Sequence, residues 1–122
     1  FIQAEAASRL GLIQALGPLE SNSRTIAWIL YAIDMAAGQA PVSLTDVSAA
    51  ADAINHAVPT QQELSSSLKW LQAHGLVESQ GRFHSLSVRG CNLVGQSRGN
   101  ASTVSAVWAH LAEGIRRISA GA

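Results

Sequence analysis

The sequence predicts a mostly helical α+β domain that contains one small β-hairpin. Three observations predict this class: apolar residues recur at helical spacing in several stretches, capping motifs begin two of these stretches, and two short strand-like runs flank Gly81. The chain has 122 residues, of which 48% are hydrophobic and 5% aromatic. This apolar surface suffices for one core of closely packed helices, so we expect residues 1–122 to form a single domain.

The first expected helix covers residues 1–17. Apolar residues from Ile2 to Leu16 recur with helical spacing, and Gly17-Pro18 ends the pattern because proline cannot continue a helix. The segment 19–23 is polar enough to be a linker before the next helix.

The second expected helix begins near residue 24 and ends at Gly38, three residues before Pro41. Its apolar residues occupy more than one side, which predicts that neighbouring elements cover it on several sides. The short segment Pro41-Val42-Ser43 that follows is expected to be extended.

Two capping motifs predict where the next two helices begin. Ser43-Leu44-Thr45-Asp46 has the capping-box form with an acidic fourth residue, and predicts a third helix that runs to about Ile54. Thr60-Gln61-Gln62-Glu63 is a second capping box and predicts a fourth helix over 60–74. Gly75 is a typical residue after a helix end, because glycine adopts the left-handed conformation without strain.

The segments 76–79 and 83–88 are strand-like, and Gln80-Gly81 between them has the composition of a tight hairpin turn. A two-residue loop would place His84 on one face of the hairpin and Phe83 on the other. The sequence leaves this register open.

After the hairpin, Cys91–Val94 predicts one helical turn and residues 96–102 predict a loop. The last expected helix covers 103–119, where apolar residues from Val104 to Ile118 form a long stripe.

Two motifs in this order of elements resemble motifs of the winged helix-turn-helix superfamily. The stretch Leu68–Glu78 is similar to the L-x-x-L-x-x-x-G-L-V junction between the recognition helix and the wing of that family. The stretch Phe83–Gly90 is similar to the y-x-L-T-x-x-G end of the wing in many bacterial regulators, with Ser87 in place of the commoner threonine. The resemblance covers residues 24–94.

The resemblance implies a regulator of transcription that binds double-stranded DNA, with helix 60–74 in the major groove and wing 76–88 on the backbone or minor groove. The expected contacts come from the two helix starts, the wing tip, and the side chains that face away from Leu64, Leu68 and Leu71. They are Thr45, Thr60, Gln61, Gln62, Ser65, Ser66, Lys69 and Arg82.

The first and last expected helices carry more apolar surface than a small winged helix needs to cover itself. Pairing with a second copy would cover this surface, and many members of the family form homodimers through terminal helices. The residues expected at the dimer interface are Ile13, Val104, Trp108, Leu111 and Ile115.

The charge balance is the observation that least favours DNA. Eight Lys and Arg residues match eight Asp and Glu residues, so the bulk charge gives no general attraction for phosphates. The sequence therefore leaves a second hypothesis open, a winged-helix module that docks a protein partner and never touches nucleic acid. A positive face at Gln61, Ser65 and the wing would favour DNA, and a neutral apolar face there would favour a protein.

Other site chemistries find little support. The four histidines show no pair at metal-ligand spacing, the single Cys91 excludes an intramolecular disulfide, and no phosphate loop or nucleophile motif is present. We therefore expect no enzyme activity, no metal and no cofactor, and no pattern identifies a small-molecule effector. No apolar run is long enough to span a bilayer, which predicts a cytoplasmic protein without a membrane partner.

Overall fold

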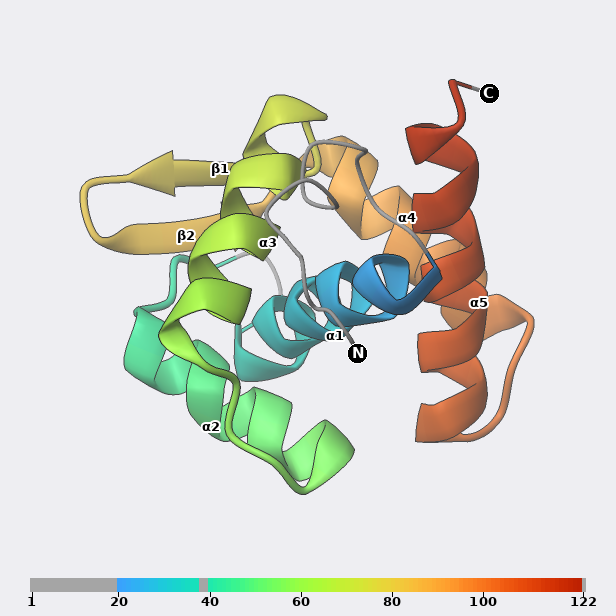
Figure 1. Cartoon of the computed structure of the whole chain (residues 1–122), viewed down its shortest axis with the longest axis horizontal. Helices are drawn as coiled ribbons and strands as arrows, with labels where there is room; N and C mark the ends of the chain where they lie inside the picture. Colours follow the sequence, from blue (N-terminus) through green and yellow to red (C-terminus); the bar gives the residue numbers. More distant parts are fainter. Residues whose placement is uncertain (1–19, 38–39, 122) are drawn as a thin grey trace, which may run out of the picture.

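The computed structural model describes residues 20–37 and 40–121, which form five helices and a two-stranded antiparallel sheet (Figure 1). The elements, in order, are α1 (Glu20–Ala37), α2 (Leu44–Asn55), α3 (Gln61–Ala73), β1 (Val77–Gln80), β2 (Phe83–Leu86), α4 (Val88–Gly99) and α5 (Val104–Ser119). The predicted mostly helical α+β class is confirmed for these residues. The helix expected over 1–17 lies outside them.

Helix α1 lies at the centre of the fold, with α2 and α3 on one side and α4 and α5 on the other (Figure 1). All residues from Ile26 to Ile33 are buried, so this stretch of α1 is covered on several sides, as its sequence predicts. The indole Nε1 of Trp28 donates to the carbonyl oxygen of Ala51 at 2.8 Å and joins α1 to α2. The linker expected over 19–23 is wrong for residues 20–23, because Ser23 faces the core and continues the helix.

Both predicted helix starts are confirmed by their capping bonds. The Ser43 hydroxyl accepts from the Asp46 amide at 3.3 Å at the start of α2. At the start of α3, the Thr60 hydroxyl accepts from the Glu63 amide at 3.0 Å, and Glu63 Oε1 accepts from the Thr60 amide at 2.8 Å. These short-range bonds satisfy amides that have no partner inside the helix, which is why the sequence locates the helix starts so closely.

Helix α3 ends in a Schellman motif at Gly75. The Leu76 amide donates to the Leu71 carbonyl at 2.9 Å, and the Gly75 amide donates to the Gln72 carbonyl at 3.1 Å. Gly75 has φ +73°, a left-handed conformation that favours glycine. The chain reverses here, so the hairpin begins beside the C-terminal half of α3 (Figure 1).

The structure fixes the register of the hairpin. Gln80 pairs with Phe83, so the loop is Gly81-Arg82 and lies one residue later than predicted. Gly81 has φ +63°, as the first position of a type II′ turn requires. Directly paired residues share a face, so Val77, Ser79, His84 and Leu86 lie on the inner face, and Glu78, Gln80, Phe83 and Ser85 lie on the outer face.

A third extended segment pairs with the hairpin at one residue. Val42 exchanges backbone hydrogen bonds with His84, at 2.8 Å from the Val42 amide and 2.9 Å from the His84 amide. The expected extended segment around Val42 therefore forms an isolated bridge beside β2. The prediction that the second strand extends to Val88 is wrong, because Ser87 ends the hairpin and caps the next helix.

Helix α4 replaces the single turn expected over Cys91–Val94 and the part of the expected loop over 96–99, while residues 100–102 are not helical, as predicted. Its glycines lower the intrinsic helix propensity, so its helical pattern is weak in the sequence. Contacts with residues distant in the sequence stabilise α4 instead. At Gly90 the helix approaches Leu76 so closely that a Cβ would lie 2.1 Å from the Leu76 carbonyl oxygen. This close approach explains the glycine that ends the second motif.

Helix α5 packs along α1 with the apolar stripe predicted for residues 103–119. Val107, Leu111 and Ile115 are buried between the two helices. Trp108 Nε1 donates to the Arg24 carbonyl at 2.8 Å, and the Arg24 guanidinium lies 4.3 Å from the centre of the Trp108 ring. The terminal helix is thus held by contacts within the same chain.

Replacing Gly90 with alanine should lower the free energy of unfolding by about 1–3 kcal/mol, because the new methyl group would meet the Leu76 backbone. Gly95 lies in the same helix with open space around its Cα. Gly95→Ala is therefore the matched control, and should raise stability by about 0.5–1 kcal/mol through helix propensity alone. Urea denaturation of both variants measures the difference; equal effects would contradict the close contact at Gly90.

Candidate nucleic-acid interface

Helix α3 presents a polar face to solvent. Leu64, Ser67, Leu68 and Leu71 are buried on one side of the helix. The structure brings five of the predicted DNA contacts together on the exposed side: Gln61, Gln62, Ser65, Ser66 and Lys69. The spacing of the leucines places them there, since residues between the buried positions point away from the core.

Four exposed residues form a line along this side, which we call the α3 line: Gln62, Ser66, Lys69 and Ala73. Their spacing of four, three and four residues places them above one another on the helix. The line holds one cation, no carboxylate and no large apolar side chain. The exposed large apolar side chains of the described residues all lie on other elements: Met35, Val58, Phe83, Val88 and Val104.

The two predicted threonine contacts at the helix starts differ in their surroundings. The Thr60 hydroxyl is occupied as the cap of α3, and the Glu63 carboxylate lies at the same helix end. Thr45 is exposed in the first turn of α2, next to Asp46. A carboxylate beside each helix start repels a phosphate, so this geometry disfavours the phosphate contacts that we expected from the backbone amides there.

Lys69 and Arg82 are the cations of the candidate surface, and neither has an ion pair within the described residues. Arg82 is exposed in the hairpin loop. Elsewhere Arg98 pairs with Asp34, while both Arg116 and Arg117 pair with Glu113. These ion pairs lie on α1, α4 and α5, away from the α3 line, and involve neither cation of the candidate surface.

A chain of hydrogen bonds that the sequence does not reveal joins α3 to the hairpin. Gln72 Nε2 donates to Ser79 Oγ at 2.7 Å, and Ser79 Oγ lies 2.6 Å from His84 Nδ1. Burial lowers the pKa of His84 below its usual value. Finding this chain from the sequence would require the hairpin register, because only that register places Ser79 opposite His84.

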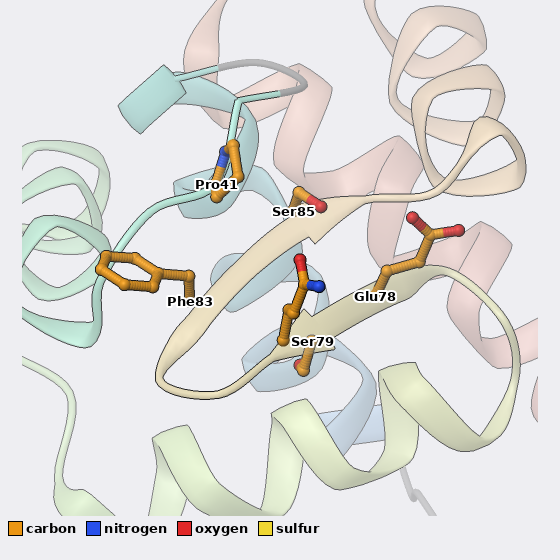
Figure 2. A pocket seen from close by; sticks show the side chains of 6 residues that line it. Pro41, Glu78, Ser79, Phe83 and Ser85 are labelled. Atoms are coloured by element: carbon orange, nitrogen blue, oxygen red, sulfur yellow. The ribbon is translucent and has the colours of Figure 1, made fainter.

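A shallow hollow of about 280 Å³ lies against the hairpin, mostly on its outer face. Its lining residues are Pro41, Glu78, Ser79, Gln80, Phe83 and Ser85. Figure 2 shows Phe83 and Pro41 at one end and Glu78 at the other. Glu78 is the one charged residue of the lining, so the hollow does not attract a phosphate.

The residues predicted for a dimer interface are placed differently from one another. Leu111 and Ile115 are fully buried against α1, Trp108 is half-buried on Arg24, and Val104 is exposed. Ile13 lies outside the described residues. The apolar stripe of α5 is therefore covered by α1 of the same chain, which corrects the expectation that Leu111 and Ile115 are available to a second copy.

Two further findings concern residues 20–37 and 40–121. None of their helices combines the length and apolar character that crossing a membrane requires. Within this same part of the chain, no three His, Cys, Asp or Glu side chains are grouped so that they could hold a metal ion.

Comparisons of the chain with protein-family models, curated proteins and solved structures found no significant match.

Thr60→Ala should lower the free energy of unfolding by about 1 kcal/mol, because it removes the hydroxyl that caps α3. Thr60→Ser keeps that hydroxyl and is the matched control, with stability near that of the unchanged protein. Thermal or urea unfolding of the two variants tests the assignment. If Thr60→Ala were as stable as Thr60→Ser, the hydroxyl would have no capping role.

Proposed function

We propose that this chain is a DNA-binding regulator of transcription with a winged helix-turn-helix fold. In this proposal α3 is the recognition helix in the major groove, and the hairpin is the wing on the backbone or minor groove. The observation that carries the proposal is the polar α3 line, which is free of carboxylates and lies on the same helix that hydrogen-bonds to the hairpin.

The arrangement of elements supports the proposed fold. Helix α1, the Val42 segment, α2, α3 and the two strands follow in the order that the resemblance implies. The two family-like motifs also have physical roles here. Gly75 forms the sharp turn after α3, while Ser87 caps α4 and Gly90 permits its contact with Leu76.

The chemistry of the exposed side chains assigns their roles in DNA binding. Lys69 and Arg82 would neutralise phosphates, since neither has an ion pair among the described residues and both are exposed. Gln62 and Ser66 can donate to and accept from base edges in the major groove, and glutamine makes a paired contact to adenine in particular. Gln61 and Ser65 flank this line and are placed for adjacent bases or phosphates.

A homodimer and a cytoplasmic location belong to the proposal. Two copies with recognition helices about 34 Å apart would contact two half-sites one helical turn apart. Because Leu111 and Ile115 are buried within the chain, contacts between copies would use other surface, including the exposed Val104.

The alternative function is docking of a protein partner without nucleic acid. The exposed Phe83 beside Pro41 on the outer face of the hairpin favours it, since an exposed aromatic ring next to a hollow is typical of a protein contact. DNA binding would use the α3 line and the hairpin loop, whereas protein docking would use the outer face of the hairpin. Phe83→Ser would weaken protein docking and leave DNA affinity unchanged.

Replacing Lys69 and Arg82 by glutamine should weaken DNA binding at all sequences and reduce its dependence on salt, with a slope lower by about one for each phosphate that is no longer neutralised. Arg117→Gln is the matched control, because Arg117 is exposed but pairs with Glu113 on α5. Fluorescence anisotropy with duplex genomic fragments at several salt concentrations measures both quantities. A folded protein that binds no duplex DNA at low salt would overturn the proposed function.

A further inference from the structure

His84 lies at the middle of the small sheet and has a buried side chain. Its backbone is paired on one side with Val42 and on the other with Ser79. Its ring lies on the inner face of the hairpin and is 8% exposed as a residue. Protonation or substitution of this ring would therefore affect β1, β2 and the extended segment at Val42 together.

The hydrogen bonds assign a direction to the chain from Gln72 to His84. Gln72 Nε2 can only donate, so Ser79 Oγ accepts from it and is left with one proton to donate. In a neutral ring with its hydrogen on Nε2, His84 Nδ1 accepts that proton. This direction of the hydrogen bonds belongs to the neutral imidazole.

No other charged group stabilises a proton on His84, because desolvation is the single cause of its lowered pKa. The titratable groups of the elements packed against β2 and β1 face other partners or the opposite side. On α1, Arg24 lies on Trp108, Tyr31 lies under Arg98, and Asp34 pairs with Arg98.

The same holds on the remaining elements. On α4, Arg89 donates to the His74 carbonyl, and Cys91 contributes nothing to the His84 pKa. On β1, Glu78 lies on the outer face. On α3, His74 stacks on Trp70, while Glu63 caps the helix start and Lys69 lies on the α3 line.

We propose that Gln72, Ser79 and His84 are positioning residues that hold the wing against the recognition helix, and that protonation of His84 releases the wing and weakens DNA binding. This inference rests on the proposed function. A proton on Nδ1 would turn that atom from an acceptor into a donor, reverse its hydrogen bond with Ser79, and place a positive charge on a buried ring. The hairpin would separate from α3 before any helix unfolds, because its two strands have four residues each.

The sign of the pH dependence follows from the direction of the pKa. Because the folded ring has a pKa below the unfolded value of 6.5, the unfolded or released state takes up a proton first. The wing contact is complete above pH 6.5 and disappears as the pH falls through 6.5 towards the folded pKa.

The test compares DNA affinity at pH 7.5 and pH 5.5, at fixed salt, for the unchanged chain and four variants. The unchanged chain should bind about three- to tenfold more weakly at pH 5.5. His84→Asn places a non-titrating amide oxygen near the position of Nδ1, and should bind equally at both pH values. Ser79→Ala should bind weakly already at pH 7.5, and Ser79→Thr should restore binding by restoring the hydroxyl.

Ser85→Ala is the matched control, because Ser85 lies in the same hairpin on its outer face. It should keep the affinity and the pH dependence of the unchanged chain. The positioning role is overturned if the unchanged chain binds DNA equally at both pH values while His84 titrates. It is also overturned if Ser85→Ala behaves like Ser79→Ala. In both cases the proposed function stands.

Imidazole nitrogen NMR on the DNA-free protein gives a readout that does not depend on the proposed function. We expect the Nε2-protonated tautomer at pH 7.5, and loss of the Ser79 and His84 amide protection at pH 5.5. Should these changes occur in a chain that binds no duplex DNA, the proposed function fails while the release of the wing is supported. A ring protonated on Nδ1 at pH 7.5 would overturn the assigned direction of the hydrogen bonds from Gln72 to His84.

Discussion

The backbone of residues 74–76 is the junction on which the candidate surface depends. The carbonyl groups of these three residues follow the end of α3, and the start of α4 supplies their hydrogen-bond donors. Ser87 Oγ donates to the Gly75 carbonyl at 2.6 Å, and Arg89 Nη1 donates to the His74 carbonyl at 2.7 Å. The Ser87 amide also donates to the Leu76 carbonyl at 3.0 Å. These contacts fix α3, the hairpin and α4 relative to one another, and so set where the α3 line and the hairpin loop lie.

Sequence reasoning succeeded where the determining bonds are local. The caps at Ser43 and Thr60 and the glycine at 75 lie within a few residues of the helix ends that they set, so α2 and α3 were predicted almost to the residue. Helix α4 was missed because its stability comes from contacts with distant residues, whereas its own glycines favour a loop. The hydrogen bonds from α3 to the hairpin were missed because they depend on a register that the sequence left open.

The apolar stripe of α5 shows why a pattern does not name its partner. Burial of apolar surface has no direction, so a stripe predicts that something covers it and not which chain does so. Here α1 covers the stripe, and the Arg24 guanidinium of α1 lies over the Trp108 ring of α5. The neutral charge is similar, because a sum over the sequence cannot distinguish Arg117, paired on α5, from Lys69 on the α3 line. Only the position of a residue in the fold shows whether an apolar stripe is already covered and whether a cation is already paired.

The most direct test of the proposed surface is a map of the protein amides that respond to duplex DNA. Titration of labelled protein with a duplex at low salt, followed by backbone amide NMR, identifies the contact surface residue by residue. We expect shifts concentrated in residues 61–73 and in the hairpin loop at Gly81 and Arg82, with α5 unchanged. Shifts confined to α5, or none in a folded protein at low salt, would contradict the assignment of α3 and the hairpin as the nucleic-acid surface.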